Sequence, residues 1–157
     1  MNALQRETLS SYQRSRARSR ELFDLLTDEA YYYQPIALRH PIVFYEGHLP
    51  GFSFNSLMKK GLGRPSIDAR LEDLFARGID PHESSAAAGT AAAAESLWPS
   101  RDVVRAFAAD AGTQIESVLA TGDLDRPGHA PLDRAEAAFC IIEHEALHHE
   151  RGCPTDC

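Results

Sequence analysis

Two histidines near the end of the chain have the spacing of a metal-binding pair on a helix. They are His144 and His148, within the stretch IEHEALHHE (residues 142–150). Residues four apart on an α-helix lie about 40° apart around its axis and about 6 Å apart along it, so both imidazoles can reach one ion. Two ligands hold a transition metal poorly, and a catalytic site takes a third ligand from another element while leaving a position open. The pair therefore predicts a further ligand elsewhere in the chain.

His48 is the strongest candidate for this third ligand. It lies within the apolar stretch FYEGHLPGF, where Gly47 and Gly51 would allow another part of the chain to approach closely. A lone histidine on an apolar face is more often a buried core residue, and an isolated pair is more often on the surface. The hypothesis therefore depends on all three histidines meeting. Three glutamates near them in sequence could orient the rings by hydrogen bonding: Glu46, Glu143 and Glu145.

The remaining histidines have weaker cases. His149 follows His148 directly and points about 100° away around a helix, so it does not join the same site. His40 is expected at a helix start, where it caps the helix or meets solvent. His82 and His129 fall in loops beside proline or glycine, and nothing in the pattern ties them to chemistry.

The string HEALH also matches H-E-x-x-H, the zinc-protease pattern in which the glutamate acts as general base on metal-bound water. Such proteases need a third ligand downstream, and only nine residues follow His148. The longer pattern fails because Arg151 and Pro154 occupy its glycine and histidine positions, which leaves Glu150 or Cys153 to serve as ligand. No strand is predicted that could hold a peptide along its edge, so a protease is disfavoured.

Helices must position these residues. Apolar residues at helical spacing predict four long helices, at about 7–26, 41–60, 100–121 and 132–150, and no stretch has a convincing strand pattern. Pro41 suits a first helical turn and Ser100 an N-cap. Pro50, between two glycines of the second helix, predicts a kink or break.

The pattern as a whole predicts an all-α four-helix bundle. Residues 62–99 form a long link that holds a short helix near residues 67–78 and an alanine-rich run expected to be loosely ordered. The link predicts a crossover between the second and third helices. The four alternating arginines of the first helix, Arg14, Arg16, Arg18 and Arg20, are expected on a solvated surface. The inward residues of the last two helices are expected to be Val103, Val104, Phe107, Ile115, Val118, Leu119, Ala135, Ala138, Phe139, Ile142 and Leu147.

Composition places the chain among globular proteins of one domain. It has 157 residues, with 16 Lys and Arg against 23 Asp and Glu, and this net charge of −7 disfavours nucleic acid as a partner. No apolar run approaches the roughly 18 residues of a membrane span, and the first residues are too polar for a signal peptide. We expect a cytoplasmic protein that does not bind membranes. Three cysteines do not suggest a disulfide framework.

Four stretches carry a resemblance to one enzyme family: LRHPIVFYEGHLPGFSFNSL, GRPSIDARLEDLFARGIDP, WPSRDVV and IEHEALHHE. They resemble the N-terminal DinB-like four-helix domain of the nonhaem-iron sulfoxide synthases, which include the ergothioneine, ovothiol and selenoneine synthases. The resemblance covers residues 12–150 and looks closest to the ovothiol and selenoneine branches. It implies His48, His144 and His148 as ligands of Fe(II), with Zn(II) or another divalent metal as the alternative.

The resemblance also implies a reaction. Enzymes of this family use oxygen to couple a thiol or selenol to the imidazole ring of histidine or hercynine, so these small molecules are the expected partners. Three neutral imidazoles on one side of Fe(II) leave positions for O₂ and for the sulfur or selenium donor. Full members continue into a second domain that resembles the formylglycine-generating enzyme fold and supplies substrate contacts and a catalytic tyrosine.

The chain departs from the family after residue 150. We expect residues 1–150 to form the DinB-like metal-binding bundle and residues 151–157, RGCPTDC, to form a short tail in which Gly152 and Pro154 end the helix. The tail is typical of a truncation or a shifted reading frame. Three functions stay open: a synthase domain served by a separately encoded second domain, a stand-alone DinB-like metal-dependent thiol transferase, and a folded remnant without activity.

Overall fold

The computed structural model shows a helical protein and describes residues 1–34, 39–76 and 98–151. Its long helices are α1 (Ala3–Asp24), α3 (Ile42–Ser53), α6 (Arg101–Thr121) and α7 (Glu136–Arg151). The shorter elements are α2 (Asp28–Tyr32), the π-helix η1 (Phe54–Gly61), α4 (Ala69–Phe75) and the 3-10 turn η3 (Asp133–Ala135). These residues include no strand, which confirms the all-α prediction. The alanine-rich run, residues 84–96, lies outside the described residues.

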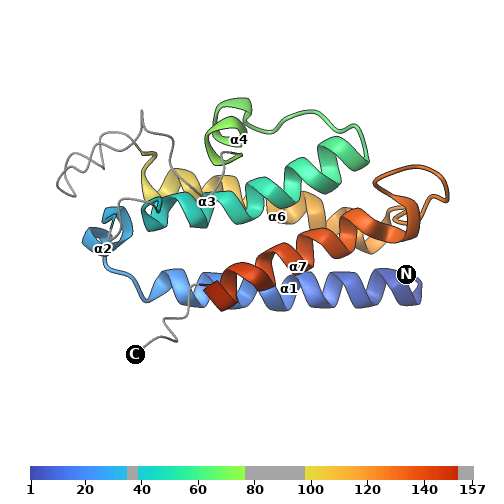
Figure 1. Cartoon of the computed structure of the whole chain (residues 1–157), viewed down its shortest axis with the longest axis horizontal. Helices are drawn as coiled ribbons and strands as arrows, with labels where there is room; N and C mark the ends of the chain where they lie inside the picture. Colours follow the sequence, from blue (N-terminus) through green and yellow to red (C-terminus); the bar gives the residue numbers. More distant parts are fainter. Residues whose placement is uncertain (35–38, 77–97, 152–157) are drawn as a thin grey trace.

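The long helices form a four-helix bundle made of two parallel pairs (Figure 1). α1 packs beside α6 and α7, and α3 with its extension η1 packs beside the same two helices. α1 and α7 run in one direction, and α3 and α6 run in the other. Because α3 and α6 are parallel, the link between them must return along the bundle, as the predicted crossover requires. α4 belongs to this link and packs against α3.

Helix α3 and η1 form one continuous rod despite an internal proline. Pro50 lacks the N–H that would bond the carbonyl of Glu46, yet the helix continues to Ser53 and then widens into the π-helix η1. The sequence predicted a kink or break at Pro50. The structure instead has a change from α-helical to π-helical pitch after Ser53. π-Helical turns are rare and are frequent at functional sites. This one directly follows the part of α3 that carries His48.

Capping side chains explain where two of the helices begin. α1 starts earlier than predicted because Asn2 and Gln5 form a capping box, in which each side chain accepts a hydrogen bond from the other's backbone N–H. Ser100 caps α6 as predicted, with its side chain accepting from the backbone N–H of Val103. α7 begins only at Glu136, because the preceding residues form the 3-10 turn.

One arginine of the first helix is buried, contrary to the prediction of a solvated surface. Arg16 is 4% exposed and donates to Glu145 of α7 across a distance of 3.0 Å. The arginines spread around the helix, and Arg16 falls on the side that α7 covers. The other three, Arg14, Arg18 and Arg20, are exposed as predicted.

Two buried clusters form the core. The larger one joins α1, η1, α6 and α7 and includes Leu57, Ile115 and Ile141. The smaller one joins α2, α3, α4 and α6 around Phe44 and Phe75. Three residues expected to face the core are exposed instead: Val103, Phe139 and Leu147. Among the described helices, none has the length and apolar character needed to cross a membrane.

Candidate metal centre

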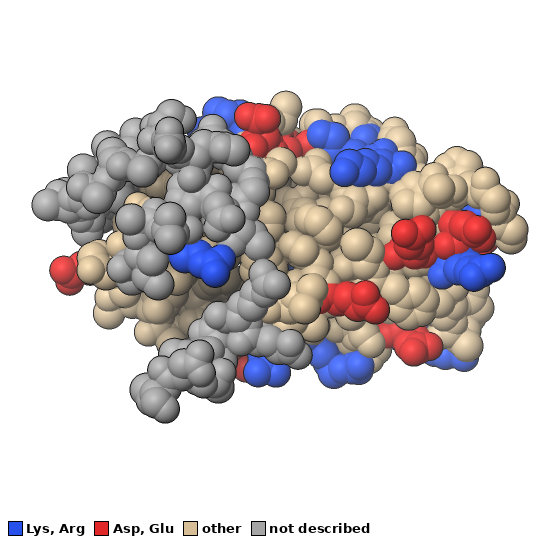
Figure 2. Space-filling model, in the orientation of Figure 1, with Lys and Arg blue, Asp and Glu red and all other residues tan. Residues whose placement is uncertain are grey.

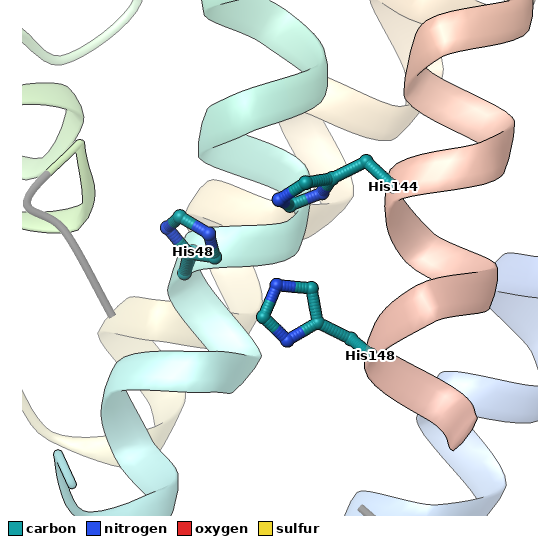
Figure 3. A group of neighbouring side chains, drawn as sticks. All are labelled: His48, His144 and His148. Atoms are coloured by element: carbon teal, nitrogen blue, oxygen red, sulfur yellow. The ribbon is translucent and has the colours of Figure 1, made fainter. Parts of the chain in front are cut away.

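The rings of His48, His144 and His148 converge between α3 and α7 (Figure 3). The distance between ring centroids is 5.1 Å for His48 and His144, and 5.3 Å for His48 and His148. The two rings on α7 are 4.7 Å apart. One nitrogen from each ring lies within 4.8 Å of the other two. The structure thus brings together the three residues that the sequence singled out, from two distant parts of the chain.

The orientation of the His48 ring is set by the backbone of α4. Its Nδ1 lies 2.7 Å from the carbonyl oxygen of Phe75, which can only accept, so Nδ1 carries the proton. The Nε2 atom is then unprotonated, and it is buried without a hydrogen-bond partner among the described residues. Burial lowers the pKa of His48, although the hydrogen bond to Phe75 works in the opposite direction. His48 therefore presents a neutral nitrogen with a free lone pair.

His144 is also held neutral. Burial lowers its pKa to about 3, and the charges that His148 and His48 would carry add to the effect. Its ring stacks on Phe52, with centroids 3.6 Å apart and an angle of 11° between the planes. Its Nδ1 is buried and has no hydrogen-bond partner within the described ranges. At neutral pH this ring is uncharged and one of its two nitrogens keeps a free lone pair, which is the form that binds metals.

Aromatic rings surround the triad on the α3 side. Phe44 stacks on His48, with centroids 5.0 Å apart and planes at 20°. Tyr45 lies against His148 at a centroid distance of 5.9 Å. Such contacts restrict ring rotation and lower the local dielectric constant, which strengthens an interaction between a nitrogen lone pair and a cation. The surroundings therefore favour a fixed arrangement of the three ligands.

A divalent metal ion fits this donor set. Metal–nitrogen bonds of about 2.1 Å put the nitrogens of a shared ion roughly 3 to 4 Å apart. Since the ring nitrogens already lie within 4.8 Å of one another, small side-chain rotations would close the triad. Neutral imidazoles suit iron, zinc, copper and nickel, and two buried nitrogens otherwise lack partners among the described residues.

The nearby glutamates do not orient the histidines as expected. Glu145 is 1% exposed and accepts from Arg16 and Ser19 of α1. Glu46 is 5% exposed and accepts from Arg105 of α6 at 3.2 Å. Glu143 is exposed on α7. The protease reading loses support as well, because the glutamate of its motif is Glu145, whose carboxylate is bound to α1.

Outside the triad, the histidines have other surroundings. His149 contacts Ser19 on α1, with 2.8 Å between Nε2 and Oγ, and it stays outside the cluster as predicted. His40 is 5% exposed and packs on Phe44 with ring centroids 4.1 Å apart, so the expectation that it meets solvent is wrong. His129 is exposed, and His82 lies outside the described residues.

A groove of about 580 Å³ opens beside His48, between η1 and α4. Phe52, Asn55 and Lys60 line one wall, and Asp73 lines the other. Figure 2 shows acidic and basic side chains along this edge of the molecule. Since both signs of charge are present, the groove suits a small polar molecule that carries both charges.

Sequence reasoning missed Phe52 and Phe75. Phe75 acts through its backbone carbonyl, which any residue possesses, so its identity carries no signal. Gly47 does carry one: a Cβ atom at this position would lie 2.3 Å from the Phe75 ring, inside van der Waals contact. A glycine one residue before a candidate ligand thus indicated that another element approaches there.

Comparisons with known proteins identify the family of the chain. The DinB superfamily matches residues 11–151. "Ergothioneine biosynthesis protein 1" of Neurospora crassa is 27% identical over 127 residues, which make up 80% of this chain. The match covers 14% of that relative, so the chain spans a small part of its length. Because the superfamily match includes nearly all described residues and all three histidines of the triad, the chain belongs to the DinB superfamily.

Proposed function

We propose that this chain is the iron-binding domain of an oxygen-dependent enzyme of the sulfoxide or selenoneine synthase type. The enzyme would form a C–S or C–Se bond on the imidazole of histidine or a derivative such as hercynine. The observation that carries the proposal is the triad of His48, His144 and His148, whose rings converge with two buried, unpartnered nitrogens among the described residues. Similarity to a protein named for ergothioneine biosynthesis supports the substrate class.

The residues of the chain would prepare the site before any substrate arrives. The Phe75 carbonyl fixes the His48 tautomer, and stacking on Phe52 fixes the plane of His144. Because burial keeps these two rings neutral, no proton has to leave either of them when a cation binds at pH 7. When bound, Fe(II) would supply the redox chemistry and coordination positions for O₂ and the chalcogen donor.

The groove beside His48 would accept part of a substrate. Lys60 could pair with a carboxylate and Asp73 with an ammonium group, and these are the charged groups of amino-acid-like donors and acceptors. Lys59 is already occupied by Glu72 at 2.6 Å, so Lys60 is the better candidate. This arrangement would place a polar molecule next to the metal without using the three ligands.

We further propose that catalysis needs a second domain beyond these helices. The face over α3 and α7 carries few charges in Figure 2, and Leu147, one residue before a triad histidine, is 51% exposed. A second domain packed there would exclude water from the metal and complete the substrate contacts. In the curated relative, the matched part is 14% of the length, which leaves room for such a domain in that protein.

Nitric oxide binding to the iron-loaded protein would test the open coordination positions. Protein loaded with Fe(II) without oxygen should bind nitric oxide and give the paramagnetic resonance signal of a high-spin iron nitrosyl. Addition of cysteine should change the signal, because a thiolate would occupy a neighbouring position. A Lys60→Gln variant should need a higher concentration of cysteine for the same change in the signal. Lys59→Gln, which removes the lysine that is already paired with Glu72, serves as the control.

The outcome also separates the two enzyme classes. Iron that binds nitric oxide and then responds to cysteine supports the synthase proposal. If iron does not bind, while zinc binds and a thiol still reaches it, a metal-dependent thiol transferase replaces the proposed function. If the protein binds neither iron nor zinc, it is neither a synthase domain nor a metal-dependent thiol transferase.

A further inference from the structure

Four side chains connect α1 to the last turns of α7, directly behind the triad. Arg16 and Ser19 come from α1, and Glu145 and His149 come from α7. Glu145 Oε1 accepts from the Arg16 guanidinium at 3.0 Å and from the Ser19 hydroxyl. Ser19 Oγ also lies 2.8 Å from His149 Nε2. We call these four residues the α1–α7 clamp.

The hydrogen bonds of the clamp have a defined direction. Ser19 has one hydroxyl proton, which it donates to Glu145, so its oxygen must accept from the Nε2–H of His149. The order of donation is therefore His149 to Ser19 to Glu145.

The clamp and the metal ligands occupy the same two turns of α7. Glu145 follows His144 and His149 follows His148, so each clamp residue lies about 100° around the helix from its neighbouring ligand. Rotation or translation of these turns would move the two clamp residues of α7 and the two triad histidines together. Helix α7 extends to Arg151, close to His148, and the last turn of a helix frays unless other contacts hold it.

Burial makes the clamp a rigid constraint. Arg16 is 4% exposed, Ser19 is 1% exposed and Glu145 is 1% exposed. A buried carboxylate that moves away from its arginine has neither a counter-ion nor water around it. The pair therefore fixes the position of the helix more firmly than a surface pair would. A buried charge is also a costly way to join two helices that apolar residues could join, which indicates a task beyond cohesion.

We propose that Arg16, Ser19 and Glu145 are positioning residues for the metal centre. They fix the rotation and depth of the last turns of α7, so that His144 and His148 face His48 before an ion arrives. The clamp residues would act on the triad through the backbone of α7. The inference rests on the proposed metal-binding function, and its test distinguishes failure of one from failure of the other.

Cobalt(II) serves as the probe, because its visible absorption reports coordination geometry and its affinity can be measured by competition with a chelating dye. Arg16→Met and Ser19→Ala should each weaken cobalt binding by about tenfold, the lower range for lost supporting contacts around a metal site. Both should also change the absorption bands, since the two α7 ligands would no longer be held in one geometry. Arg16→Lys should recover part of the affinity.

Two controls separate positioning from general loss of stability. Arg14→Met makes the same chemical change two residues away on α1, where the side chain is exposed and donates to Ser10 and Ser11. Leu124→Ala removes a buried residue of the larger core cluster that carries no charge. Cobalt affinity and spectrum should be unchanged in both, even though Leu124→Ala lowers the melting temperature.

The results decide the proposal in each case. Unchanged cobalt affinity and spectrum in Ser19→Ala, which removes one oxygen and keeps the helix, would overturn the positioning role. This variant also decides the question if Arg16→Met fails to fold. An equal loss of affinity in Leu124→Ala would likewise overturn it, because general destabilisation would then explain the effect. Failure of the wild type to bind cobalt would instead contradict the metal centre itself.

Discussion

At the scale of single residues, the site depends on histidines that are kept neutral by burial. His48 and His144 both have a lowered pKa, with loss of hydration as the largest cause. Two like-charged rings about 5 Å apart would also repel each other if both were protonated. The same features that prepare the rings for a metal make the metal-free protein sensitive to acid.

The metal-free protein should therefore lose stability as the pH falls below about 6.5. The folded His144 has a pKa of about 3, whereas the unfolded chain takes up a proton near 6.5, so protons favour the unfolded state between these values. Allowing for solvent screening of a half-buried ring, His144→Gln should reduce the loss between pH 6.5 and pH 5 by about 1 kcal/mol. Urea unfolding at several pH values measures this.

His129→Gln provides the control for this pH dependence, because His129 is exposed in a loop. Its pH profile should match that of the wild type. If His144→Gln also follows the wild-type profile, burial of His144 does not set the acid sensitivity.

The contact between Gly47 and Phe75 gives a second prediction at this scale. In Gly47→Ala the added Cβ would lie 2.3 Å from the Phe75 ring, which is fully buried and cannot move freely. We expect a loss of about 1–3 kcal/mol in the free energy of unfolding. Metal affinity should fall too, because the Phe75 carbonyl would move away from His48. Chemical denaturation and metal competition measure the two effects.

Gly112→Ala is the matched control, since no atom lies within 4 Å of its added Cβ in the middle of α6. This variant should gain about 0.5–1 kcal/mol from helix propensity and keep its metal affinity. A tolerated Gly47→Ala, with stability and affinity like the wild type, would show that α4 does not press on α3 as described.

The sequence was sufficient to single out the three histidines that converge and insufficient to predict the residues that support them. His144 and His148 share a helical spacing, and His48 stands between glycines, so a local pattern marks each ligand. The hydrogen bond of His48 goes to a backbone carbonyl 27 residues away, and no residue type marks such an acceptor. The stacking of Phe52 on His144 and the burial of His40 likewise depend on tertiary packing.

At the scale of elements, ion pairs with the buried carboxylates of Glu46 and Glu145 hold the helices that carry the triad. Arg105 of α6 donates to Glu46 of α3 and to Asp24 of α1, so one guanidinium joins three helices. Glu46 is 5% exposed, and its Oε2 has no hydrogen-bond partner among the described residues. It lies two positions before His48 along α3. This ion pair supports the α3 ligand from the opposite side of the bundle to the clamp.

Arg105→Met should lower the free energy of unfolding by about 2 kcal/mol, because it leaves the Glu46 carboxylate buried without its arginine. The double variant Arg105→Met/Glu46→Gln should be less destabilised than the sum of the single changes, since glutamine removes the unpaired charge. Additive losses in such a double-mutant cycle would show that the two side chains are not coupled. Arg126→Met, which loses only an exposed pair with Asp123, should cost little.

The positions of the helices could largely be predicted from the sequence. The burial of their side chains could be predicted less well. Helical periodicity and the Ser100 cap predicted the helices of the bundle, and the long link predicted the crossover. Periodicity marks an apolar stripe but does not reveal how much of it a neighbour covers, so Phe139 and Leu147 were wrongly expected in the core. Likewise, Arg16 could be placed inside only once α7 was known to pack beside α1.

At the scale of the whole molecule, the proposed ion would join α3 to α7, two helices from distant parts of the sequence. Binding to the folded state alone would stabilise the bundle by mass action, by about 2.7 kcal/mol when free metal is a hundredfold above its dissociation constant. The metal would join α3 to α7, the clamp joins α1 to α7, and Arg105 joins α6 to α3 and α1. The proposed function depends on three imidazoles that this packing brings together.

Metal content after equilibrium dialysis tests the central claim most directly. It should be measured with Cys153 and Cys157 changed to Ser, so that thiols of the tail do not bind metal. The account predicts one divalent ion per chain in this background and in His129→Ala, and loss of that ion in His48→Ala, His144→Ala and His148→Ala. A full equivalent retained by any of these three variants, or no ion in the parent protein, would contradict it.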